Sequence, residues 1–201
     1  MPKLLYQGHG NYRLTADDSR VVYVDPYAGT GYDAPADVIL VTHNHPDHNN
    51  IGLCAKKQGC RIITSKDALA GGQHNSFDLD GIRVTAVEAK SLFHNPKKCV
   101  GYIIEIDGIK LYASGDTSRT KQMDTFAELR LDYAIFPGTG ILSMGLKEAA
   151  ECAALIGAKH NTIVHLKPGS LFDRAKAEKW TAPNKLIIEP GQEMNIDIKS
   201  L

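Results

Sequence analysis

The chain has 201 residues, 43% of them hydrophobic, and its 23 basic and 23 acidic side chains give a formal charge of zero. This length can bury a sizeable core, and we expect residues 1–201 to form a single domain. Zero net charge, without a run of five like charges, argues against a nucleic-acid or membrane partner and leaves a small-molecule substrate as the expected partner.

The N-terminus reaches Gly8 and His9 before seven consecutive apolar residues occur, and no apolar stretch reaches 18 residues. A signal peptide and a transmembrane helix are therefore not expected, and we predict a soluble, cytoplasmic protein. Without C-x-x-C spacing, the cysteines are expected to be reduced and mostly buried. They are Cys54, Cys60, Cys99 and Cys152. The sequence does not indicate the oligomeric state, and a homo-oligomer stays an open alternative.

Strand patterns dominate the first third of the chain, at residues 3–7, 12–15, 21–24 and 38–42. Turns containing Gly, Asp and Pro separate these segments, so we expect one sheet built by hairpins. The segment 25–37 has no periodicity and is long enough to be a loop that borders a functional site.

Residues 41–48 read Val-Thr-His-Asn-His-Pro-Asp-His and place four potential metal ligands within six residues. Side chains two residues apart at a strand end can point in one direction, so we expect His43 and His45 to face one metal position. Asp47 and His48 would then open a following helix and face a second position. The pattern predicts half of a two-metal site and disfavours the alternative of a His-rich turn.

Further along, the spacing of Ile51, Cys54 and Ala55 with Gly59 predicts a helix after the motif. Strand patterns follow, with a hairpin turn at 107–108. Their ranges are 61–64, 82–89, 100–106, 110–114, 133–136, 161–166, 186–189 and 194–198. Helix patterns occur at 120–131, at 146–156 with Gly157 as C-terminal cap, and near 171–180.

The remaining ligand candidates lie at the ends of predicted strands or in a loop. Asp116 follows a strand and Gly115, and its two carboxylate oxygens could bridge two cations, although an aspartate capping a helix is the alternative. His165 leaves an apolar strand, as His43 does. His94 lies in a polar loop without a distinctive motif, so His74 is kept as the fallback ligand.

These motifs resemble the metallo-β-lactamase superfamily, in particular its small UlaG-like metal-dependent hydrolases. The resemblance covers most of the chain in the expected order. It is carried by Gly8-His9, Asp25-Pro26, the motif 43–48, Gly115-Asp116-Thr117, the loop 137–140, Ser143-Met144, the Ala-rich helix 148–150 and the strand ending in His165. The sequence departs from the family after His165, where it reads Leu-Lys-Pro-Gly.

The resemblance implies an α/β fold, a four-layer αββα sandwich with the metal site at one edge of its two sheets. It also implies two divalent metal ions in a binuclear centre, with zinc preferred and manganese or iron as alternatives. One ion would be held by His43, His45 and His94, the other by Asp47, His48 and His165, and Asp116 would bridge them. For substrate binding we consider His9, Lys167 and Ser143.

Chemically, two such cations generate a bridging hydroxide that needs no Ser or Cys nucleophile, with Asp47 as the candidate catalytic residue. We therefore predict an enzyme, a hydrolase of a small ester or lactone such as a phosphorylated sugar lactone. A phosphodiesterase or nuclease is the alternative, but the neutral charge does not favour nucleic acid. A non-hydrolytic metal-binding or redox module is the third hypothesis.

Overall fold

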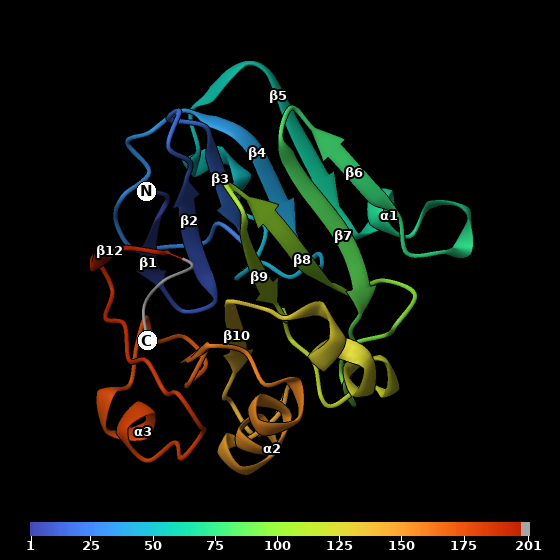
Figure 1. The fold of residues 1–201 in the computed structure, drawn as a ribbon, viewed down its shortest axis with the longest axis vertical. Coiled ribbons are helices and arrows are strands. Elements are labelled where there is room, and N and C mark those ends of the chain that lie inside the picture. The colour runs from blue at the N-terminus through green and yellow to red at the C-terminus, as the bar shows by residue number, and fades with distance from the viewer. Residues whose placement is uncertain (198–201) are drawn as a thin grey trace.

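The computed structural model describes residues 1–197 and contains two six-stranded sheets that share one core (Figure 1). The strands of the first sheet lie in the order β12, β1, β2, β3, β4, β5. Their bounds are β12 (Glu193–Asn195), β1 (Lys3–Gly8), β2 (Asn11–Thr15), β3 (Val21–Val24), β4 (Ala36–Val41) and β5 (Lys56–Thr64). The predictions at 3–7, 12–15, 21–24 and 38–42 are confirmed to within two residues.

The second sheet has the order β11, β10, β9, β8, β7, β6. Its strands are β11 (His160–Val164), β10 (Tyr133–Pro137), β9 (Ile109–Ala113), β8 (Val100–Ile106), β7 (Ile82–Glu88) and β6 (Ser76–Leu79). The turn between β8 and β9 is the predicted one, because Asp107 and Gly108 both adopt positive φ, at 49° and 80°. A tight hairpin between right-twisted strands requires that conformation.

The prediction that hairpins connect the first four strands of the chain is wrong for the last of them, β4. β1, β2 and β3 pair antiparallel, whereas β3 with β4 and β4 with β5 pair parallel. Parallel neighbours need long connections, which the segments 25–35 and 42–55 provide. Both connections leave the carboxyl ends of strands, and this places them where the ligand candidates lie.

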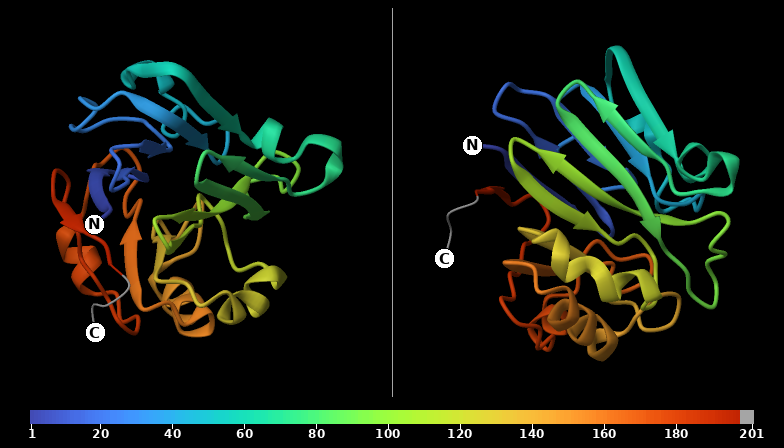
Figure 2. Two further views of the ribbon diagram at one scale, coloured as in Figure 1. Left: turned by 45° about the horizontal axis from the view of Figure 1, so that its top comes forward. Right: turned by 45° about the vertical axis from the view of Figure 1, so that its right-hand side comes forward.

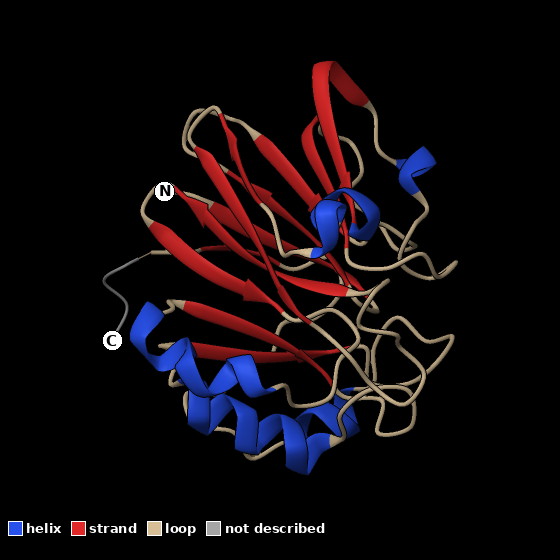
Figure 3. Cartoon of the chain, turned by 90° about the vertical axis from the view of Figure 1, so that its right-hand side faces the viewer, coloured by secondary structure: helices blue, strands red, loops and turns tan. Residues whose placement is uncertain are grey.

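Helical segments cover the outer face of the second sheet (Figures 2 and 3). They are α2 (Leu146–Ile156), α3 (Arg174–Glu178) and η3 (Lys121–Leu129). The bounds of α2 match the prediction, and its cap Gly157 has φ 66°. The segment η3 is a 3-10 helix, shorter than the helix predicted at 120–131. Its buried Met123 and Phe126 pack against the sheet, where the ring of Phe126 lies 5.2 Å from that of Tyr112.

The outer face of the first sheet has a different cover. Val21, Tyr23, Ile39 and Val41 pack there with residues of the connection 25–35 and of the short 3-10 turn η1 (Ile51–Leu53). Sheets with helical and loop layers outside confirm the predicted α/β sandwich.

Several local predictions are wrong. The helix expected from Ile51 to Gly59 is reduced to η1, because the chain from Lys56 onward pairs with β4 and becomes β5. Asp47 and His48 consequently lie in a turn and open no helix. Between β5 and β7, where no regular element was predicted, the chain forms α1 (Ser65–Ala68), η2 (Ala70–Gly72) and β6. Residues 186–189 form no strand, and position 198 of the last predicted strand lies outside the described residues.

Within the described part of the chain, no helix is long and apolar enough to cross a membrane. The four cysteines are free thiols, and three of them are buried, as predicted; Cys60 is intermediate in exposure.

Candidate metal centre

The ligand candidates come together where strands of both sheets end. The motif 43–48 follows β4, Asp116 follows β9, and His165 follows β11 directly. His94 arrives from the loop between β7 and β8, and His9 from the turn after β1. Carboxyl ends of neighbouring parallel strands meet at one edge of a sheet, which explains how residues distant in sequence converge here.

The first group consists of His43, His45 and His94, whose ligand atoms all lie within 4.8 Å of one another. Their ring centroids are 4.4 to 4.9 Å apart. His43 and His94 are buried and His45 is exposed, so the group opens to solvent on one side. The structure therefore places His94 in the predicted triad. The fallback candidate His74 is exposed and belongs to no ligand group among residues 1–197.

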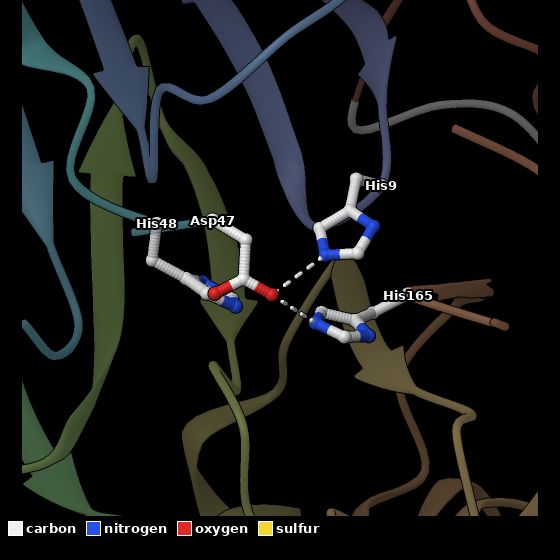
Figure 4. Close-up of side chains that lie close together, drawn as sticks. All are labelled: His9, Asp47, His48 and His165. Carbon is white, nitrogen blue, oxygen red and sulfur yellow. Dashed lines mark hydrogen bonds and ion pairs between the residues drawn. The ribbon is translucent and has the colours of Figure 1, made fainter. Parts of the chain in front are cut away.

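The second group brings together Asp47, His48 and His165, as predicted, and adds His9 (Figure 4). Asp47 Oδ2 lies 3.1 Å from His9 Nε2 and 3.6 Å from His165 Nε2. The ring of His9 packs on that of His165 with centroids 3.8 Å apart, and the backbone N–H of His165 donates to the carbonyl of His9 at 2.7 Å. These contacts join the end of β1 to the end of β11.

Asp116 lies between the two groups and is buried. One carboxylate oxygen is 3.8 Å from His48 Nε2, and the other is 3.7 Å from His94 Nε2 and 3.5 Å from His165 Nε2. The carboxylate thus faces ligands of both groups, as a bridging position requires. Gly115 permits this approach, because it adopts φ 60° and an added Cβ would lie 2.9 Å from Thr42 Cβ.

Five imidazole nitrogens in the centre are buried without a hydrogen-bond partner, namely Nε2 of His43, His48, His94 and His165 and Nδ1 of His165. Burying a polar atom without a partner costs free energy, so native proteins rarely leave such atoms unpaired. Imidazole nitrogens beside carboxylate oxygens are the donor set that Zn²⁺, Mn²⁺ and Fe²⁺ accept. The residues therefore fit divalent cations, which would supply the missing partners.

Hydrogen bonds at Nδ1 fix three of these imidazoles, those of His43, His48 and His94. His48 Nδ1 lies 2.9 Å from Asp25 Oδ2, and Asp25 also accepts from the backbone N–H and the hydroxyl of Thr42, both at 2.7 Å. Because the Thr42 hydroxyl donates to Asp25, it accepts from His43 Nδ1 at 3.0 Å. His94 Nδ1 donates to the carbonyl of Leu142 at 3.1 Å. In each case Nε2 is left as the free donor atom, an arrangement typical of metal-binding histidines.

Sequence reasoning did not assign a role to Asp25 or Thr42. Asp25 directly follows β3, just as His165 directly follows β11. Its position at a strand end could therefore have identified it from the sequence as a residue of the site. Asp25, His9 and His165 all adopt positive φ, at 48°, 55° and 49°. Such backbone conformations are unfavourable for residues other than glycine and concentrate at functional sites.

Burial and charge shift the pKa values of the centre in opposite directions. Burial lowers the pKa of His43 and of His94 below the usual value, which keeps both neutral and able to bind a cation. Burial also acts on His48, but the carboxylates of Asp25 and Asp116 outweigh it and raise the pKa of His48 to about 9. The neighbouring imidazoles of His165 and His9, at 3.6 and 3.1 Å, hold the pKa of Asp47 far below its usual range.

The three predicted substrate-binding residues occupy different environments. His9 is fully buried, with Nε2 3.1 Å from Asp47 Oδ2 and Nδ1 3.0 Å from the carbonyl oxygen of Ser170. Ser143 is buried, with its hydroxyl 2.7 Å from that of Thr139. Lys167 is exposed. A cavity opens beside the first triad, with His43, His45 and His94 in its wall, and none of the three predicted substrate-binding residues lines it.

A sandwich of two sheets that gathers histidines and aspartates at its strand ends is a candidate metal enzyme, and comparison with known proteins identifies its class as metal-dependent hydrolases. The model of the beta-lactamase superfamily domain matches residues 3–163. A UPF0173 metal-dependent hydrolase from Pyrococcus furiosus is 27% identical over 98% of this chain and 100% of that protein. Another from Methanoregula boonei is 29% identical over 96% of this chain and 97% of that protein.

Among solved structures, Igni18, a metallo hydrolase from Ignicoccus hospitalis, superposes with a TM-score of 0.75. It is 21% identical and covers 98% of this chain and 99% of that chain, so it supports the fold. The chain belongs to the beta-lactamase superfamily. The predictions of this superfamily and of a hydrolase enzyme are confirmed.

Proposed function

We propose that the protein hydrolyses a small ester or lactone at a binuclear centre formed by seven ligands. The observation that carries the proposal is the set of four unpartnered, buried imidazole Nε2 atoms in the centre that contains Asp116. The ligands are His43, His45, Asp47, His48, His94, Asp116 and His165. When bound, two divalent cations, preferably zinc, supply a hydroxide nucleophile near neutral pH and polarise the carbonyl under attack.

The chain's own groups position the reactants. Asp47 is one third exposed, so it can reach both a bound cation and a substrate. Because its pKa is strongly lowered, Asp47 acts as an acceptor that orients the nucleophile and is poorly suited to carry a proton. His9 fixes the orientation of this carboxylate, because its Nε2 donates to Asp47 Oδ2. The carbonyl oxygen of Ser170 contacts the opposite nitrogen of His9 and fixes the ring. His9 is therefore a positioning residue.

We place the protein among the small UlaG-like hydrolases because its loop 137–140, Ser143-Met144 and the strand ending in His165 resemble that branch. The neutral charge favours a small substrate over a nucleic acid. The four free thiols fit a reducing compartment, and we propose a cytoplasmic location.

The test is a hydrolysis screen of the metal-loaded protein on lactones, simple esters and small phosphodiesters, with metal content measured on the same samples. We expect chelator-sensitive cleavage of an ester or lactone that is absent from His48→Ala and His165→Ala. Each variant should also bind about one metal equivalent where the unmodified protein binds about two. His160→Ala is the matched control, because His160 stacks on Tyr133 with ring centroids 4.8 Å apart and belongs to no ligand group.

Two results would contradict the proposal. Cleavage of phosphodiesters alone would show that the substrate is a phosphodiester and not an ester or lactone. Two bound metals without any chelator-sensitive cleavage would favour a non-hydrolytic role for the same centre.

A further inference from the structure

A cavity of about 570 Å³ opens directly beside the first triad, and His43, His45 and His94 form part of its wall. This volume falls within the range of roughly 300 to 1,000 Å³ that small-molecule sites occupy. A substrate whose reacting bond lies at the metal centre would extend into this space. The other lining side chains therefore decide which substrates fit.

The cavity wall is cationic although the whole chain is neutral. Lys66, Lys97 and Lys98 line it, and no acidic side chain among residues 1–197 does. None of the three lysines forms a salt bridge within the described part of the chain. Asp67, the neighbour of Lys66, is engaged by the backbone N–H and the hydroxyl of Thr64, at 2.9 and 2.7 Å.

This charge distribution is unfavourable for an empty site. Divalent cations at the triad would repel three nearby ammonium groups, because like charges raise each other's free energy. An anion in the cavity reverses the sign of that interaction, since it would be attracted to the lysines and to the metal centre at once. The arrangement thus favours a negatively charged ligand over a neutral one.

The same cavity also has an apolar side, formed by Leu69 and Phe93. Phe93 is 54% exposed and its neighbour Leu92 is 89% exposed, although apolar side chains of this size are usually covered. The loop that carries them is held at its base, because Ser91 Oγ donates to the carbonyl of Leu142 at 2.6 Å. The cavity therefore combines an apolar surface on a tethered loop with a cationic wall. This combination suits a ligand that has an apolar part and a negatively charged group.

We propose that this cavity selects a substrate with an apolar body and an anionic group, either a carboxylate or a phosphate. Lys66, Lys97 and Lys98 bind the anion, and Phe93 covers the apolar body. The inference deepens the proposed function and rests on it only in placing the bond to be cleaved at the triad. The lysines and Phe93 are specificity-determining residues, because they contact the part of the substrate that does not react.

The test measures binding separately from turnover. The probes are 4-phenylbutyrate, its neutral amide 4-phenylbutanamide, and 3-phenylpropylphosphonate, each titrated into the full chain by calorimetry. We expect both anions to bind about tenfold or more tightly than the amide, and the preference to fall as NaCl is raised. The stronger of the two anions identifies the carboxylate or the phosphate as the natural group.

Variants assign the preference to particular side chains. The double variant K97Q/K98Q should weaken both anions by about five- to tenfold and leave the amide unchanged, as expected for two partly screened contacts. Phe93→Ala should weaken the anions and the amide alike. The matched control is Lys147→Gln, which changes an exposed lysine of α2 that pairs with Glu151 at 3.9 Å, away from the cavity.

Because a carboxylate can also bind a metal directly, each titration is repeated on chelated protein. A preference for anions that survives chelation and disappears in K97Q/K98Q supports the proposal. Equal binding of anion and amide overturns it, and so does a preference that chelation abolishes while K97Q/K98Q retains it. Failure of the hydrolysis screen is a separate result, since these titrations require no turnover.

Discussion

Replacing Asp25 by Asn should change how metal binding depends on pH. Asp25 is buried and accepts from His48 Nδ1, and together with Asp116 it outweighs burial and raises the pKa of His48 to about 9. In the metal-free protein His48 therefore carries a proton at pH 7. A cation can bind Nε2 of His48 only when that proton leaves, so metal binding releases it.

The sign and size of the effect follow from this pKa. Affinity for the second cation should rise with pH as His48 loses its proton and level off above pH 9, where the proton is already absent. Between pH 7 and pH 9 the expected gain is about 100-fold, one decade for each pH unit. Asp25→Asn removes the charge that holds the proton, so the dependence should flatten. The loss of the carboxylate should lower the affinity near pH 9 by about 10- to 100-fold.

The assay is calorimetric titration of zinc into chelated protein at several pH values. Each titration is run in two buffers of different ionisation enthalpy to count released protons. Water bound to the metals can also release protons, so the informative quantity is the difference between the unmodified protein and Asp25→Asn. The control is Asp132→Asn, a buried carboxylate that accepts from the backbone N–H of Lys110 at 2.9 Å and lies outside every ligand group. Equal proton release from the unmodified protein and Asp25→Asn would refute the reasoning.

Three further predictions concern the metal ligands and the core. Asp116→Ala should reduce occupancy at both positions, because its carboxylate faces both groups; loss of one metal equivalent alone, by elemental analysis, would exclude bridging. His94→Ala should deplete metal while His74→Ala does not, and the reverse result would reassign the first triad. Phe136→Ala should lower the free energy of unfolding by about 3–5 kcal/mol, because this fully buried ring packs near Trp180; urea denaturation followed by Trp180 fluorescence measures it, and a loss below about 1 kcal/mol would contradict the packing.

The sequence by itself determined the elements that short-range signals encode. Helix α2 has the predicted bounds because its apolar periodicity and the left-handed cap at Gly157 lie within one segment. Strands β3 and β8 were placed correctly for a similar reason, since both are short, largely buried runs between turns. The motif 43–48 was recognisable because four ligands stand close together along the chain.

Strand pairing determined the secondary structure of the segments for which local sequence patterns gave a wrong prediction or none. The spacing at 51–59 predicts a helix, but the chain from Lys56 onward hydrogen-bonds to the edge of β4 and becomes a strand. The free energy of that pairing depends on residues distant in sequence, so periodicity within one window does not contain it. β6 was missed for the same reason, because it is a short edge strand whose regularity comes from β7.

Only the tertiary structure decided how the centre is completed. His94 has no distinctive neighbours in sequence, and its place beside His43 follows from the packing of the two sheets and from the bond to Leu142. The same packing puts His9 behind Asp47 and gathers the lysines around one cavity. Ligand identity is a local property of the sequence, whereas ligand orientation and cavity shape depend on contacts between strand ends that are far apart along the chain.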